Sequence, residues 1–148
     1  MVTERQQQID AFFNDYSDTF NRSLTGSMPD AAHTAALFSN CFVAASPLGV
    51  NCGQNDAAFR QVMKKGYAFY KSIGITSMDI IAKDITTLDD FHTMARIRWR
   101  SKFTRKDGQQ GSLEFQNIYF VQTRNDEHKV FAYITGDEEA ALKDMDLI

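Results

Sequence analysis

The sequence predicts an α+β domain, and two features of its order carry that prediction. In the first half of the chain apolar residues recur at steps of three and four, the period of an amphipathic helix. From about residue 75 the period changes to two, as in half-buried strands. Helices followed by a meander of antiparallel strands favour helices packed on one face of a sheet. With 148 residues, 43% of them hydrophobic, we expect a single domain spanning 1–148.

The first helix is predicted over residues 4–24. Its apolar stripe consists of Ile9, Phe12, Phe13, Tyr16, Phe20 and Leu24. A short second helix follows the turn-like stretch "TGSMPD", because Pro29 and Asp30 suit the first turn of a helix. This second helix is expected to end near Asn40.

A strand is expected next, over "CFVAASPLGVNCG", which Pro47 and two glycines interrupt. The third helix is predicted over 56–73, where Asn55 can cap its start and Gly74 its end. Four further strands, separated by turn-forming residues, are predicted over 75–88, 91–104, 112–124 and 129–135. Acidic residues in the first turn of "GDEEAALKDM" predict a short terminal helix.

The overall charge limits the classes of partner. The formal net charge is -3, so no global field draws the protein to nucleic acid or to an anionic membrane. The start, "MVTERQQQIDAFF", lacks the apolar run of a signal peptide, and no stretch approaches the roughly 20 apolar residues of a membrane span. We therefore expect a cytoplasmic protein with neither nucleic acid nor membrane as its partner.

The cysteines and histidines give no sign of a metal or redox centre. Cys41 and Cys52 have no partners at metal-ligand spacing, and we interpret both as small buried hydrophobic residues. His33, His92 and His128 are spread over a helix, a strand end and a turn, where no two share ligand spacing. Neither a metal nor a cofactor is predicted.

The stretch "FHTMARIRWRSKF" divides by alternation into two surfaces. One carries Trp99, the only tryptophan of the chain, beside small polar groups. If a loop centred on Gly108 closes a hairpin, positions whose numbers sum to about 216 face each other, so that Trp99 meets Asn117 and Lys102 meets Glu114. A slip of one residue would move Asn117 to the cationic surface.

The other surface carries the cationic row Arg96, Arg98 and Arg100. A nucleic-acid reader would need aromatic residues on the same face, and Trp99 points the other way, so we interpret the row as solvated or facing a second subunit. Anion binding by this row is a further open hypothesis. Ile118 and Phe120 share the face, and large apolar groups there favour a homodimer packed sheet to sheet.

The order of three helices and a curved sheet resembles the nuclear transport factor 2-like superfamily, which includes polyketide cyclases of the SnoaL type and ketosteroid isomerase. The segment "ALFSNCFVAASPLGVNCGQNDAAFRQV" is similar to the isomerase stretch where a helix ends at Leu-Phe and a strand runs to a catalytic Asp before Pro-x-Gly. The resemblance implies a cone-shaped curved antiparallel sheet, three N-terminal helices packed on its concave face, and a sheet-to-sheet dimer.

The resemblance also places functional positions. The catalytic base of the isomerases falls on Ser46, and "YSDTFN" resembles the stretch with an oxyanion-hole tyrosine, which falls on Tyr16. "LEFQNIYFV" resembles the strand with the second oxyanion acid, which falls on Asn117. An amide donates a hydrogen bond at any pH, so Asn117 could serve as that donor. Ser46 departs from the pattern, because a serine hydroxyl needs an activating partner to act as a base at pH 7.

These observations lead to two hypotheses of function. In the first, the protein binds a small, largely apolar ligand between helices and sheet, with isomerase, lyase or cyclase-type chemistry in which Tyr16 and Asn117 are the oxyanion donors. The expected pocket residues are Phe12, Tyr16, Phe38, Ser46, Trp99 and Asn117. The alternative interpretation is that Tyr16 and Trp99 are core residues and Ser46 a turn residue. The second hypothesis is a non-catalytic dimerisation or adaptor module with a vestigial pocket.

Overall fold

Four helices and six strands form in the part of the chain that the computed structural model describes, residues 1–26 and 30–148. Pro29, expected in the first turn of the second helix, lies outside the described residues. The elements are α1 (Glu4–Thr25), α2 (Ala31–Ala36), β1 (Phe38–Ser46), β2 (Gly49–Gln54), α3 (Ala57–Ser72), β3 (Ile75–Thr87), β4 (His92–Thr104), β5 (Gln110–Arg124), β6 (Glu127–Ile134) and α4 (Glu138–Asp144).

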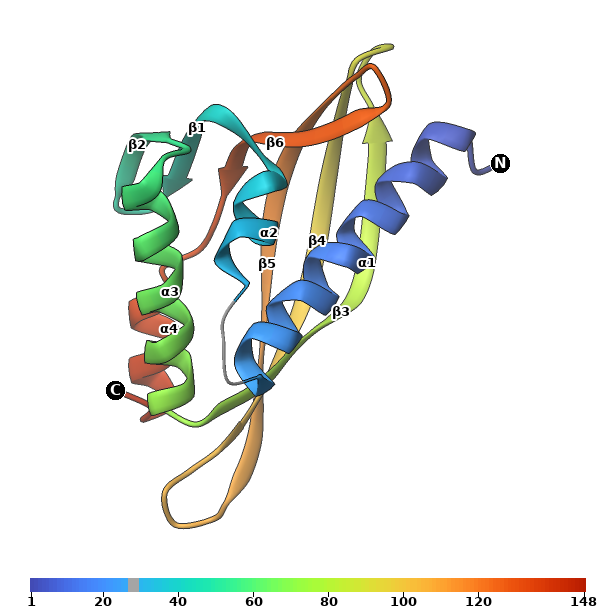
Figure 1. Ribbon diagram of the computed structural model, residues 1–148. Coiled ribbons are helices and arrows are strands. Elements are labelled where there is room, and N and C mark those ends of the chain that lie inside the picture. The colour runs from blue at the N-terminus through green and yellow to red at the C-terminus, as the bar shows by residue number, and fades with distance from the viewer. Residues whose placement is uncertain (27–29) are drawn as a thin grey trace.

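The strands form one curved, unclosed sheet in the order β2-β1-β6-β5-β4-β3. Neighbours are antiparallel except β1 and β6, which run parallel. The helices gather on the concave side, where α1 runs along β3 and α4 lies beside α3 (Figure 1). The predicted α+β class is confirmed. The strand expected over "CFVAASPLGVNCG" forms as two strands, β1 and β2, which join the expected meander of four strands through the parallel pair of β1 and β6.

The helix α2 ends at Ala36, earlier than the expected end near Asn40, because the chain after it pairs with β6. The carbonyl of Leu37 accepts a hydrogen bond from Val130 of β6 at 2.8 Å, so pairing with the sheet replaces helical bonding before Asn40 is reached. Asn55 does not cap α3. Its side chain donates to the carbonyls of Ala35 and Phe38 at 2.7 and 3.0 Å and fixes the end of α2.

The hairpin of β4 and β5 has a register two residues from the predicted one. Trp99 faces Phe115, Asn117 faces Ile97 and Glu114 faces Arg100. The turn is centred one residue earlier than expected, and Gly108 occupies a left-handed position in it with φ +89°. A shift of two residues preserves the alternation, so Asn117 still points to the concave face.

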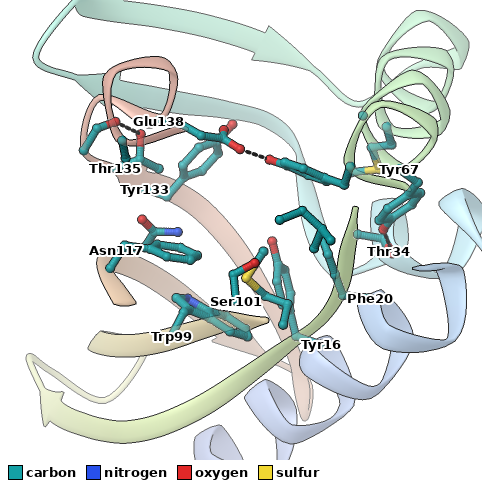
Figure 2. Close-up of a pocket in the computed structure, with 18 of the residues that line it drawn as sticks. Tyr16, Phe20, Thr34, Tyr67, Trp99, Ser101, Asn117, Tyr133, Thr135 and Glu138 are labelled. Atoms are coloured by element: carbon teal, nitrogen blue, oxygen red, sulfur yellow. Dashed lines mark hydrogen bonds between the residues drawn. The ribbon is translucent and has the colours of Figure 1, made fainter. Parts of the chain in front are cut away.

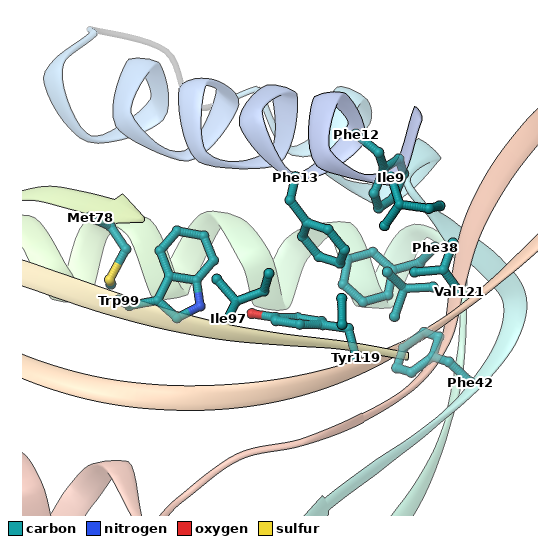
Figure 3. Close-up of a cluster of buried hydrophobic side chains, with 12 residues drawn as sticks. Ile9, Phe12, Phe13, Phe38, Phe42, Met78, Ile97, Trp99, Tyr119 and Val121 are labelled. Atoms are coloured by element: carbon teal, nitrogen blue, oxygen red, sulfur yellow. The ribbon is translucent and has the colours of Figure 1, made fainter. Parts of the chain in front are cut away.

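The main core lies between α1 and the concave face of the sheet (Figure 3). Phe13 is fully buried, with its ring centroid 5.1 Å from that of Phe12 and 5.0 Å from that of Tyr119. Ile97 and Val121 complete this contact from the sheet. Phe12, expected in the pocket, therefore belongs to the core.

Polar contacts fix α1 to the edge strand β3. Ser17 donates from Oγ to the Met78 carbonyl at 3.1 Å, and Asn21 bonds both the carbonyl and the amide of Met78, at 3.0 and 2.7 Å. Nearer the start of the helix, Lys83 pairs with Asp10 at 2.9 Å. These contacts hold α1 over β3 and position Tyr16, which lies on the inner face of α1.

Both cysteines are exposed, which corrects the expectation that they are buried. The inward positions of β1 are taken by Phe42 and Ala44, so Cys41 points outward by alternation. Cys52 pairs with Val43, which shares that outer face.

Candidate functional site

A cavity of about 600 Å³ lies between the concave face of the sheet, α1, α3 and α4 (Figure 2). Its walls are mainly aromatic and aliphatic, with Phe20 from α1, Phe59 and Met63 from α3, and Phe115 from β5. A space of this size and composition is typical of sites for small organic molecules.

Two side chains of β4, Trp99 and Ser101, bury their polar atoms beneath the floor of the cavity. Alternation along β4 turns Trp99 and Ser101 inward, and each is only 2% exposed. Neither Trp99 Nε1 nor Ser101 Oγ has a hydrogen-bond partner among the described residues. Both atoms have almost no surface that a water molecule could touch, and Trp99 Nε1 is directed at the Tyr119 hydroxyl (Figure 3). They therefore lie beneath the cavity surface and do not face its interior.

Asn117 and two tyrosines lie beside these atoms. Asn117 donates from Nδ2 to the Tyr119 hydroxyl at 3.1 Å. Burial raises the pKa of Tyr119 to about 12. The hydrogen bond from Asn117 opposes this rise. Burial also raises the pKa of Tyr16, whose ring centroid is 5.9 Å from Trp99. Both phenols therefore stay protonated at neutral pH.

The opposite wall of the cavity is formed by α3 and α4. The Tyr70 hydroxyl donates to the Glu138 carboxylate, which joins the two helices. Burial, and next the charge of Glu138, raise the pKa of Tyr70. Further along, the Tyr67 and Thr34 hydroxyls are hydrogen-bonded at 2.8 Å (Figure 2).

The structure brings most of the expected pocket residues together. Tyr16, Phe38, Trp99 and Asn117 all line the cavity. Ser46 does not: it is the last residue of β1, next to the turn into β2, and its Oγ accepts a hydrogen bond from the Leu48 amide at 3.1 Å. The residue to which the resemblance assigns the isomerase base is therefore not among the lining residues of the cavity.

Sequence analysis missed several lining residues. Ser101 lies two residues from Trp99, so the same alternation contained the signal for it. Tyr70 and Glu138 are 68 residues apart in sequence, and no local pattern predicts their contact.

On the convex face of the sheet, the cationic row is partly paired within its own chain. Arg98 and Arg100 lie 3.4 and 2.7 Å from the Glu114 carboxylate. The hydrogen bond from Arg100 lowers the pKa of Glu114. Arg96 is exposed, and the expected pairing of Glu114 with Lys102 is wrong because of the shifted register.

Apolar side chains continue across this convex face. Ile118 and Phe120 of β5 are partly buried there, and Ile118 pairs with Ile134 of β6. Ile134, Val43 and Val50 are exposed large hydrophobic residues on the same face.

Within the ranges that the structure describes, no group of three or more His, Cys, Asp or Glu side chains could hold a metal ion. In those same ranges no helix combines the length and the apolar character needed to cross a membrane.

A curved sheet with helices on its concave side and a cavity between them defines an NTF2-like protein with a cystatin-like fold. The chain belongs to the family described as "NTF2-like protein (DUF6841)", whose model matches residues 4–138. The resemblance to the nuclear transport factor 2-like superfamily is therefore confirmed.

Solved structures agree with this assignment. An NTF2-like protein with a cystatin-like fold from Novosphingobium aromaticivorans has a TM-score of 0.70 and 12% identity, covering 97% of this chain and 88% of that one. An NTF2-like protein of unknown function from Shewanella oneidensis has a TM-score of 0.67 and 16% identity, covering 90% and 99%. A ketosteroid isomerase-like protein from Erwinia carotovora atroseptica has a TM-score of 0.64 and 16% identity, covering 90% and 96%. At these identities the likeness shows the fold alone. None of the curated proteins matches this chain in sequence.

Proposed function

We propose that this protein binds a small, largely apolar molecule in the cavity between the sheet, α1, α3 and α4. The observation that carries the proposal is an apolar cavity of about 600 Å³ that is lined by two uncharged hydrogen-bond donors, Tyr16 and Asn117. A ligand with an oxygen acceptor would take hydrogen bonds from Tyr16 and Asn117 while its apolar body contacts the aromatic walls.

The same geometry supports chemistry at a carbonyl group. Tyr16 and Asn117 line the cavity, and both can donate to an oxygen that becomes negatively charged during the reaction. Isomerase, lyase or cyclase-type chemistry of this kind also needs a base. Ser46 is outside the cavity, and the carboxylates that line it are those of Asp137 and Glu138.

Native mass spectrometry of the freshly purified protein, compared with its denatured mass, tests the proposal first, because a retained molecule adds its mass to the subunit. Titration with a neutral probe, 2-acetylnaphthalene, then follows the fluorescence of Trp99. We expect Tyr16→Phe and Asn117→Leu each to weaken binding about 10-fold, since a buried hydrogen bond contributes about 1 to 1.5 kcal/mol. The melting temperature should fall by only a few degrees, because Asn117→Leu also removes the hydrogen bond to the Tyr119 hydroxyl.

Gln116→Leu is the matched control, because Gln116 neighbours Asn117 on β5 but is exposed on the convex face. This variant should bind the probe as the wild type does. If Asn117→Leu instead stabilises the fold and neither purified nor titrated protein holds a ligand, the non-catalytic dimerisation or adaptor module is the better description.

We also propose that the convex face pairs with a second copy of the chain. Its support is the run of apolar residues from β5 to β2, in which Val50 is 69% and Ile134 42% exposed. Sedimentation analysis should find a dimer for the wild type and a monomer for Ile134→Lys. A monomeric wild type at micromolar concentration would contradict this pairing.

A further inference from the structure

We infer that the cavity selects its ligand by charge: it takes neutral or cationic molecules that present a hydrogen-bond acceptor to the sheet, and it rejects carboxylates and other anions. This inference rests on the proposed function and narrows its ligand class. Two independent features support it, one at the α4 wall and one at the floor.

The charged groups of the cavity are all of one sign. Among its described lining residues there is no Lys, Arg or His, whereas Asp137 and Glu138 both contribute carboxylates. Asp137 is occupied as the N-cap of α4, accepting from the Ala140 amide at 3.0 Å. Glu138 accepts only the neutral Tyr70 hydroxyl, which leaves its negative charge uncompensated by any cation in the lining.

The floor supplies neutral donors. The Asn117 amide and the Tyr16 hydroxyl, which both line the cavity, are uncharged donors. A ketone, ester or amide oxygen satisfies such donors without bringing a charge into the aromatic interior. An anion placed there has no cation to pair with, and burial of an unpaired charge is far more costly than burial of a dipole.

The floor and the α4 wall of the cavity therefore favour different chemical groups of one ligand. An acceptor oxygen suits the floor, whereas a hydroxyl or ammonium group suits the α4 wall, where Glu138 has a second carboxylate oxygen. An ammonium group would gain further attraction from the aromatic rings that surround the cavity.

Three probes of nearly equal shape test the inference by isothermal titration calorimetry at pH 7.5. They are the neutral ketone 2-acetylnaphthalene, the cation 1-(2-naphthyl)ethylamine and the anion 2-naphthoate. The wild type is expected to bind the ketone and the amine at least 10-fold more tightly than the carboxylate. This comparison needs no variant, so it does not depend on how any substitution folds.

The Glu138→Gln variant tests whether the charge of Glu138 is the source of this selectivity. Glutamine keeps an acceptor for Tyr70 but removes the charge. Glu138 is exposed, so solvent screens its charge, and the amine should bind about 2- to 5-fold more weakly, while 2-naphthoate should bind more tightly and the ketone should be unaffected. Glu139→Gln is the matched control, because Glu139 neighbours Glu138 in α4, is not a lining residue and pairs with Lys143 at 3.0 Å. All three affinities should be unchanged in this control.

The outcomes separate the inference from the proposed function. If 2-naphthoate binds the wild type as tightly as the ketone does, the cavity binds ligands without selecting by charge, and the inference is overturned alone. The same holds if Glu138→Gln leaves all three affinities unchanged. If none of the three probes binds up to its solubility limit, the proposed function fails and the inference fails with it.

Discussion

Gly74→Ala is expected to destabilise the protein by about 3 kcal/mol, in the range of backbone strain combined with overpacking. Gly74 ends α3 and leads into β3 with φ +93°, a conformation that alanine rarely adopts. A Cβ at this position would lie 2.2 Å from the Thr104 carbonyl oxygen, which belongs to the backbone and cannot rotate away. The Gly74 carbonyl also accepts from the Thr104 amide at 2.9 Å, so relief of the clash would cost this contact.

Gly66→Ala provides the comparison. Gly66 lies inside α3, and a Cβ there would meet nothing within 4 Å. Alanine in a helix interior is favoured over glycine by about 0.5 to 1 kcal/mol, so this variant should be as stable as the wild type or more so. Urea denaturation of both variants measures the difference. Equal stability of Gly66→Ala and Gly74→Ala would contradict the explanation given for Gly74.

The parts of the fold that could be predicted from the sequence are those with a sustained period. The stripe of α1 and the alternation of β4 and β5 both depend on burial of one face, and both form as expected. The boundary after α2 could not be predicted, because it depends on a hydrogen bond from Val130 to Leu37 and on Asn55, which lies across a hairpin.

The candidate site was likewise predictable from the sequence only in part. Asn117 could be placed inward because alternation survives a register shift of two residues. Ser46 was expected in the pocket from a count of residues along the chain, but it is not a lining residue, because β1 ends there in a tight turn and its hydroxyl accepts from the Leu48 amide. The α4 wall was beyond prediction, since the contact of Glu138 with Tyr70 is purely tertiary.

Phe13→Ala is expected to cost about 3 to 5 kcal/mol of stability, the usual range for a fully buried phenylalanine. Phe13 has no exposed surface, and its ring packs within 5.0 Å of Tyr119 and 6.2 Å of Tyr16 between ring centroids. These two tyrosines line the cavity, so loss of Phe13 removes the support behind the polar floor. Guanidinium denaturation should show the loss, and affinity for 2-acetylnaphthalene should fall as well.

Phe91→Ala is the control that separates the losses of stability and probe affinity expected for Phe13→Ala from the general effect of removing a large side chain. Phe91 is 57% exposed, so its removal should change stability by less than about 0.5 kcal/mol and leave probe binding unchanged. A Phe13→Ala variant that loses stability but binds the probe as tightly as the wild type would show that the tyrosines keep their positions without it. The stability of the core and the affinity of the cavity would then be independent. The contacts of Phe13 with Tyr16 and Tyr119 predict instead that both change together.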